Sequence, residues 1–192
     1  MKIVLYPHPA LRRKCRPLTS IDDKVRGHVR EMFELMYEAR GLGLAANQVA
    51  LPYQFLIMNL TADPKQPEHE EVYINPLIVE RKGTVEEEEG CLSLPKLYGK
   101  VRRAKNVKVH AYNLKGESVE ITANDLAARV WQHEVDHLHG ELFIDKLGPI
   151  GKFNSRGSIK EFERAYRKAQ ERGEIPPDAE LEKELDALEA LA

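Results

Sequence analysis

Apolar residues recur at helical spacing in the first part of the chain. Between residues 22 and 40 they stand three or four positions apart, at Val25, Val29, Met32, Phe33, Met36 and Tyr37. This spacing puts them on one side of a helix. Gly41 and Gly43 mark its end, because glycine adopts backbone conformations that other residues avoid. We therefore predict an amphipathic helix over residues 22–40.

The middle of the chain has strand-like patterns. A short apolar run follows Pro52 at residues 55–58, and further apolar runs occupy 72–74 and 77–79. Apolar and polar residues alternate over 107–111 and again after a turn at 113–116, which predicts an antiparallel hairpin. The Gly90–Pro95 segment, which contains Cys91, is expected to lie outside regular structure, since Gly90 favours a turn and Pro95 interrupts a strand.

A second helix is expected from about Thr122, as a cap, to His139, with Gly140 as its stop. Beyond Gly151 the chain is polar, with a helical stretch at 159–172, a break at Pro176–Pro177 and a last acidic segment. The absence of a regular strand–helix–strand repeat predicts an α+β fold. Antiparallel sheets should pack around the second helix, flanked by the first helix and a helical tail. We expect one domain over 1–150 and a helical extension over 151–192.

Composition narrows the function classes. The chain has 192 residues, of which 42% are hydrophobic and 31% charged, which is a globular balance. Its net charge of −2 argues against an extended basic surface for nucleic acid, so no specific DNA binding is expected. Cys15 and Cys91 are too few for a disulfide scaffold, and the uncharged stretch 41–62 is too interrupted for a membrane helix. We expect a cytoplasmic protein.

The second predicted helix carries the sequence His133-Glu134-Val135-Asp136-His137. Histidines four residues apart project from the same helical face and can bind one metal ion. Glu134 lies beside them, where a carboxylate can handle the protons of a water molecule. Leu126 and Val130 precede the histidines at steps of four, three and four, so we expect all four side chains to face the core.

The residues alone leave the third ligand open. A catalytic metal usually has three protein ligands, and Glu141, Asp145 and Cys91 are the candidates. The segment Gly41–Ala46 matches a dinucleotide-binding pattern, but it follows a helix instead of a strand, which argues against nucleotide binding. It is better suited to bring its backbone close to a ligand, with the Gln48 side-chain amide as a nearby donor.

Three segments together resemble the peptide deformylases, metal hydrolases that remove the N-formyl group from new bacterial polypeptides. They are residues 41–48 (GLGLAANQ), 89–93 (EGCLS) and 132–137 (QHEVDH). The resemblance covers about residues 1–150. It implies Cys91 as the third ligand beside His133 and His137. It also implies Fe(II) as the metal, with nickel, cobalt or zinc as other possibilities.

The resemblance further implies the roles of the remaining site residues. Glu134 exchanges protons with the attacking water, and the Gln48 amide and the Leu92 backbone N–H stabilise the oxyanion. Gly43 contacts the peptide backbone, while Leu42, Leu126 and Val130 line a pocket for methionine. A charge that positions the substrate is expected from Arg102 or Arg103. The substrates are N-formylmethionyl peptides, with formate as the second product.

The tail and the rival functions remain open. Lys and Arg outnumber acids between Arg156 and Arg172, so a ribosome-docking helix is an alternative to a plain solvated one. One rival function is a metallopeptidase with the same His-Glu-x-x-His helix. The other is a structural metal-binding module, which needs a fourth ligand from Cys15, His139 or Asp136.

Overall fold

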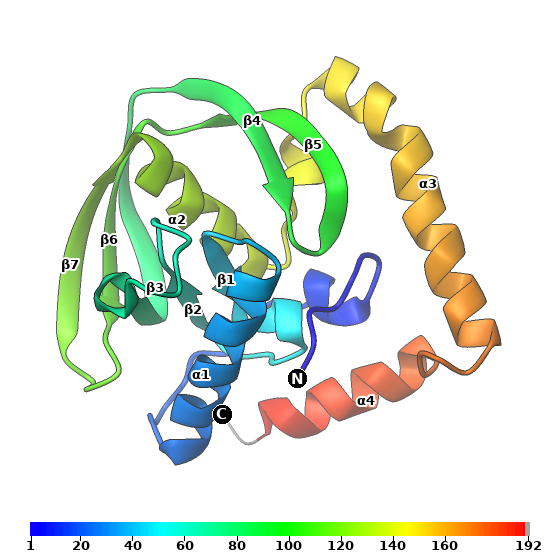
Figure 1. Ribbon diagram of the computed structural model, residues 1–192, viewed down its shortest axis with the longest axis horizontal. Helices are drawn as coiled ribbons and strands as arrows, with labels where there is room; N and C mark the ends of the chain where they lie inside the picture. Colours follow the sequence, from blue (N-terminus) through cyan, green and yellow to red (C-terminus); the bar gives the residue numbers. More distant parts are fainter. Residues whose placement is uncertain (191–192) are drawn as a thin grey trace.

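The computed structural model describes residues 1–190. The helices are α1 (Asp23–Glu38), α2 (Asp125–Leu138), α3 (Pro149–Glu171) and α4 (Asp178–Glu189), and the strands are β1 (Gly43–Ala45), β2 (Phe55–Met58), β3 (Glu71–Lys82), β4 (Val85–Cys91), β5 (Leu94–Arg103), β6 (Asn106–Tyr112) and β7 (Ser118–Asn124). One antiparallel sheet has the order β1-β2-β3-β6-β7, and β4 and β5 form a separate hairpin (Figure 1). The predicted α+β fold is confirmed, as is the hairpin formed by β6 and β7.

Strand β2 shows why the central part of the sheet is apolar on both faces. Leu56 and Met58 join the core cluster that contains Trp131 of α2, whereas Phe55 and Ile57 join the cluster of α1. Successive side chains of a strand point to opposite faces, so two helices on opposite sides require an unbroken apolar run. All four β2 residues are buried. The sheet is thus clamped between α1 and α2.

Helix α2 begins later than the sequence suggested. Thr122 lies in β7, paired with Lys108 of β6, and the N-cap is Asn124. The prediction of Thr122 as the cap was therefore wrong, because pairing with β6 continues the strand through residue 124. Asp125 turns the chain with a φ of 49°. The helix then crosses the sheet with Trp131 and Val135 packed into the core.

The β4–β5 hairpin overturns the expectation of irregular structure around Cys91. Cys91 ends β4 and pairs with Leu94, so that only Leu92 and Ser93 form the turn. The apolar residues of β5 did not reveal the strand, since Leu94, Leu97 and Val101 are not spaced by two. They pack in a third core cluster with the segment that follows α2.

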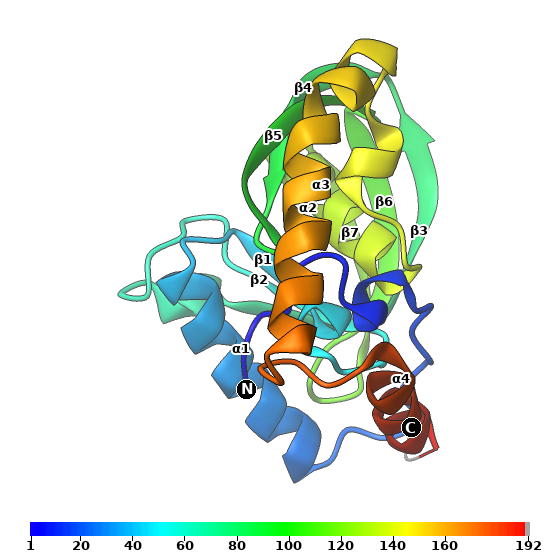
Figure 2. The ribbon, with the colours of Figure 1, turned by 90° about the vertical axis from the view of Figure 1, so that its right-hand side faces the viewer.

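The two tail helices lie along one side and the base of the molecule (Figures 1 and 2). Helix α3 begins at Pro149, earlier than the predicted residue 159, and α4 occupies the acidic segment. Helix α4 packs back on the N-terminal part of the chain. Arg13 forms ion pairs with Asp186 and Glu189, and the Tyr53 hydroxyl donates to the Leu188 carbonyl at 2.8 Å. Within residues 1–190, no helix combines the length and apolar character needed to cross a bilayer.

Candidate metal centre and active site

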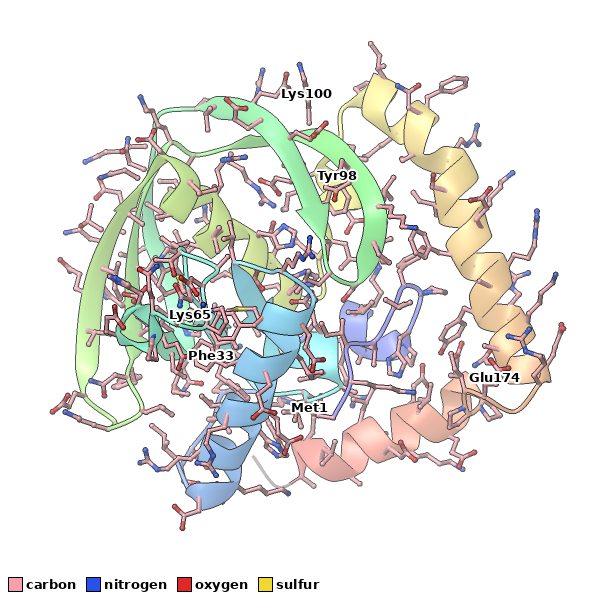
Figure 3. The ribbon with its side chains drawn as sticks, viewed as in Figure 1. Met1, Phe33, Lys65, Tyr98, Lys100 and Glu174 are labelled. Carbon is pink, nitrogen blue, oxygen red and sulfur yellow. The ribbon has the colours of Figure 1, made fainter. Side chains whose placement is uncertain are left out.

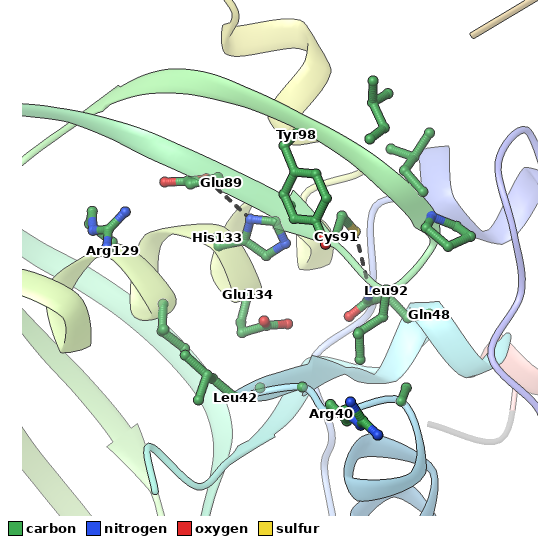
Figure 4. Close-up of a pocket in the computed structure, with 18 of the residues that line it drawn as sticks. Arg40, Leu42, Gln48, Glu89, Cys91, Leu92, Tyr98, Arg129, His133 and Glu134 are labelled. Atoms are coloured by element: carbon green, nitrogen blue, oxygen red, sulfur yellow. Dashed lines mark hydrogen bonds and ion pairs between the residues drawn. The ribbon is translucent and has the colours of Figure 1, made fainter. Parts of the chain in front are cut away.

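Three potential ligand side chains converge where the β4–β5 hairpin folds over α2. One ligand atom each from Cys91, His133 and His137 lies within 4.8 Å of the others. The Cys91 Sγ stands 3.2 Å from His137 Nε2. The histidines meet because residues four apart share a helix face, whereas the cysteine arrives from a distant strand. Figure 4 shows Cys91 and His133 facing each other across this junction.

The two carboxylates considered as third ligands, Glu141 and Asp145, form ion pairs with other residues. Glu141 accepts from Lys146 at 2.5 Å. Asp145 forms a two-pronged pair with Arg12, at 2.5 and 3.0 Å. Neither belongs to the converging group in the part of the chain that the structure describes.

The candidates for a fourth, structural ligand are also absent from this group. Asp136 accepts from Arg103 at 2.5 Å, and His139 is exposed at the C-cap of α2. Cys15 is buried in the core, where its backbone N–H donates to the Leu138 carbonyl. Among residues 1–190 only three ligands therefore converge. Three ligands are typical of a catalytic site and not of a closed structural one.

A buried ionic network orients His133. The His133 Nδ1 lies 3.3 Å from Glu89 Oε2 (Figure 4). Arg103 donates twice to Glu89, at 2.9 Å each. Burial alone would raise the pKa of Glu89, but hydrogen bonds from His133 and Arg103 outweigh it and lower the pKa to about 2. A carboxylate on one imidazole nitrogen leaves the other nitrogen free for the metal centre. The sequence placed Glu89 in a motif but gave it no role.

Glu134 is buried beside the metal ligands. Its side-chain Oε2 has no hydrogen-bond partner among the described residues. Burial raises the pKa of Glu134 to about 7, although the nearby His133 opposes the shift. A group with this pKa exchanges protons readily near neutral pH. The carboxylate has room only because residue 43 is glycine, whose added Cβ would stand 2.8 Å from Glu134 Oε1.

The Gln48 side chain is held in one orientation. Its Oε1 accepts the Ala45 backbone N–H at 2.9 Å, and an N–H can only donate, so the Nε2 must point the other way. The Nε2 donates to Ser93 Oγ at 3.2 Å and lies 3.6 Å from Cys91 Sγ. The amide donor is thus fixed at the edge of the converging group.

A pocket of about 650 Å³ opens above these residues. The six residues that the resemblance assigned to the oxyanion, the peptide backbone or the methionine side chain all line it: Leu42, Gly43, Gln48, Leu92, Leu126 and Val130. Leu126 is 43% exposed, so its helical face looks into the pocket. The expectation of a core position was wrong for Leu126, because Ala128, Trp131 and Val135 fill the core side of α2. It holds for His137, which is buried, and for Val130, which packs against the same core cluster.

The pocket's positive charges come from residues that the sequence did not single out. Arg102 and Arg103 do not line it, since Arg103 is buried against Glu89 and Arg102 is exposed on the hairpin. Arg40, Lys96 and Arg129 line it instead. Their positions follow from how α1, β5 and α2 meet, which no local pattern reveals.

Comparison with known proteins agrees with this geometry. The family model "Polypeptide deformylase" matches residues 1–153. A peptide deformylase of Rhodopirellula baltica is 41% identical over 192 residues, covering 100% of this chain and 94% of the relative. This chain belongs to the polypeptide deformylase family. The likeness extends to a deformylase of Neisseria gonorrhoeae, 42% identical over 160 residues, with 83% of this chain and 94% of the relative covered.

Solved deformylase structures share the fold. The enzyme from Plasmodium falciparum superposes with a TM-score of 0.85 at 39% identity, covering 87% of this chain and 98% of that one. A plant deformylase, PDF1B, gives a TM-score of 0.85 at 36% identity, covering 92% of this chain and 94% of that one. The expectation of a deformylase, drawn from three short segments, is therefore confirmed.

Proposed function

We propose that this deformylase hydrolyses the N-formyl group from the N-terminal methionine of newly synthesised polypeptides and releases formate. The observation that carries this is the convergence of Cys91, His133 and His137 at the base of a pocket, beside the buried carboxylate of Glu134. Metal ligands, a proton-exchanging group and an apolar pocket are what hydrolysis of a formylmethionyl amide needs.

The donor set fits a divalent metal ion. A thiolate and two imidazoles suit iron(II), zinc, nickel or cobalt, and family resemblance leads us to propose Fe(II) as the physiological ion. Bound by Cys91, His133 and His137, such an ion would supply Lewis-acid polarisation of the water and the formyl group. Cys91→Ser should lower the metal content of the purified protein, because a hydroxyl is a weaker ligand than a thiolate. Full metal occupancy in this variant would remove Cys91 from the ligand set.

Residues of the chain itself would transfer the proton and stabilise the oxyanion. Glu134 accepts a proton from the attacking water and returns it to the departing amine. The Gln48 Nε2 and the Leu92 backbone N–H donate to the formyl oxygen as it gains negative charge. The direction of the Gln48 amide, fixed by Ala45, supports its part in this arrangement.

The substrate's first residue would lie in the apolar part of the pocket. Leu42, Leu126 and Val130 would pack against the methionine side chain, and Gly43 would approach the peptide backbone. A methionine side chain is long and flexible, so it fills an apolar pocket of this kind well. Competing formyl-Met and formyl-Asp peptides should show a strong preference for methionine, and equal rates would contradict the assignment.

A formate-release assay tests the function against its rival. The protein would be purified without oxygen, analysed for metal, and assayed on formyl-Met-Ala-Ser and on casein. We expect formate from the peptide and no casein digestion. Casein digestion without formate release would favour a metallopeptidase, and metal binding without either activity would favour a structural module.

We also propose that residues 1–150 form the catalytic unit, that 151–192 are an extension, and that the enzyme works in the cytoplasm. Both cysteines are free, as a reducing compartment requires. The exposed basic residues of α3, with the ribosome as the source of the substrate, support ribosome docking by this helix. Replacing Arg156, Lys160 and Arg164 by glutamine should reduce co-sedimentation with ribosomes. Unchanged co-sedimentation would contradict docking by α3.

A further inference from the structure

Three cationic side chains surround the opening of the pocket. Arg40 follows α1, Lys96 lies in β5, and Arg129 lies in α2. Arg40 and Arg129 stand at different sides of the pocket in Figure 4. We call these three residues the cationic rim. Each comes from a different element, so the positive charge of the lining is not confined to one side chain cluster on a single helix or strand.

The charge of the rim is not compensated within the protein. Among residues 1–190, no carboxylate forms an ion pair with Arg40, Lys96 or Arg129. Arg129 donates to the backbone carbonyl of Glu88 at 3.2 Å, which is a neutral acceptor. The rim is therefore a local concentration of positive charge on a chain whose net charge is −2.

The carboxylates that line the pocket do not cancel this charge. Glu89 is already neutralised by Arg103. Glu134 is buried at the base of the pocket. Glu88 stands directly across from Lys100 in the hairpin register, and Lys100 projects into solvent from β5 (Figure 3). Even with Glu88 counted, one exposed carboxylate stands against the three cations of the rim.

Two of the rim residues occupy backbone conformations that favour glycine. The φ angle is 57° at Arg40 and 65° at Lys96. Glycine is the residue that adopts this left-handed region without steric cost, and it is the usual residue after the end of a helix, where Arg40 lies. Long cationic side chains at these two positions therefore carry a conformational energy cost. Such a cost is typical of functional sites, and here it places positive charge at the pocket opening.

We infer that the cationic rim binds an acidic side chain at the second or third residue of the formyl peptide. This inference rests on the proposed function, which places the formyl group at the metal ligands and methionine in the apolar part. Arg129 lies one helical turn, about 5.4 Å, before His133. An extended peptide advances about 3.3 Å per residue, so the residues after methionine reach the rim. The chain thus discriminates among nascent peptides by their early acidic residues.

The test compares matched peptides with a neutral C-terminal amide. The parent peptide is formyl-Met-Ala-Ala-Ala. Two further peptides carry Asp in place of Ala at the second or the third residue, and two matched peptides carry Asn at the same positions. We expect kcat/KM to be about two- to fivefold higher for Asp than for Asn at the preferred position, the range of a solvent-exposed ion pair. The ratio should fall towards one in 0.5 M salt, because salt screens exposed charges. An Asp-to-Asn ratio of one at low salt would overturn the inference.

Variants of the cationic rim test whether these three residues cause the preference for Asp over Asn. The triple variant R40Q/K96Q/R129Q should bring the Asp-to-Asn ratio to one, whereas R129K should keep it, since lysine retains the charge. The control K14Q/K115Q/K183Q removes three exposed cations that do not line the pocket and should keep the ratio. A preference that persists in the rim triple variant would contradict the assignment. Absence of formate from every peptide, Asn and Ala peptides included, would instead contradict the proposed function.

Discussion

Gly43 and Glu134 lie in such close contact that no side chain fits between them. A Cβ atom on residue 43 would stand 2.8 Å from Glu134 Oε1 and 2.9 Å from its Cγ. Gly43 is the first residue of β1, and Glu134 is in the middle of α2. The packing of β1 against α2 therefore sets the position of the carboxylate that we assign to proton transfer.

Gly43→Ala should impair catalysis more than folding. The added methyl group would displace the Glu134 carboxylate, and a misplacement of about 1 Å can lower the rate about 100-fold. We expect kcat/KM for formyl-Met-Ala-Ser to fall by about 10- to 100-fold, with metal content near that of the wild type. The matched control is Gly157→Ala in α3, where a Cβ atom meets nothing within 4 Å. Wild-type activity in Gly43→Ala would show that this contact does not constrain the reaction.

Glu134→Gln should keep the shape of the site but remove its proton acceptor. Loss of a positioned general acid–base group typically costs about 10²- to 10⁴-fold in rate. We expect a decrease of this size in kcat, measured as formate release, with the bound metal retained by elemental analysis. Glu86→Gln, an exposed change on β4, is the control and should be without effect. A Glu134→Gln enzyme with normal turnover would exclude the proton-transfer role.

Arg103→Gln should destabilise the protein far more than Arg102→Gln in the same strand. The Arg103 side chain is 3% exposed and pairs with both Glu89 and Asp136, whereas Arg102 is exposed. Removing one partner of a buried ionic network leaves uncompensated charge and costs about 3–5 kcal/mol. Surface changes stay within about 0.5 kcal/mol. Urea unfolding measures the free energy of unfolding of both variants. Equal values for Arg103→Gln and Arg102→Gln would contradict the structural role of Arg103.

His8 should make the protein less stable in mild acid. Burial lowers its pKa to about 4, and its Nδ1 accepts the Ala10 backbone N–H at 3.2 Å, which requires the unprotonated nitrogen. The unfolded chain binds this proton with a pKa near 6.5, so below that pH protonation favours the unfolded state. The free energy of unfolding should fall by about 3 kcal/mol as the pH drops from 7 to 4.

His8→Asn isolates this contribution. Asparagine does not titrate in this range, and its side-chain oxygen can also accept the Ala10 N–H. The free energy of unfolding of each protein is measured in urea at several pH values. The wild-type value minus the His8→Asn value should decrease as the pH falls from 7 to 4. Other titrating groups, the metal ligands included, cancel in this difference. A difference that is constant from pH 7 to pH 4 would contradict the lowered pKa of His8.

The sequence indicated the helices and most of the large sheet because their patterns are local. The apolar run 55–58 and the alternation over 107–111 each record the faces of one strand. The β4–β5 hairpin was not predicted, because its apolar residues are irregularly spaced and Glu86–Glu89 suggest a solvated segment. Only the packing of β5 on the segment after α2 shows why Leu94 and Val101 are buried.

The helical spacing of His133 and His137 was sufficient to expect a metal site, because two residues one turn apart stay on one face wherever the helix lies. The tertiary structure decided the rest. It brought Cys91 to the histidines, placed Glu89 and Arg103 behind His133, and put Arg40, Lys96 and Arg129 around the pocket. These contacts join segments tens of residues apart, and their geometry depends on how whole elements pack, which no short pattern along the chain encodes.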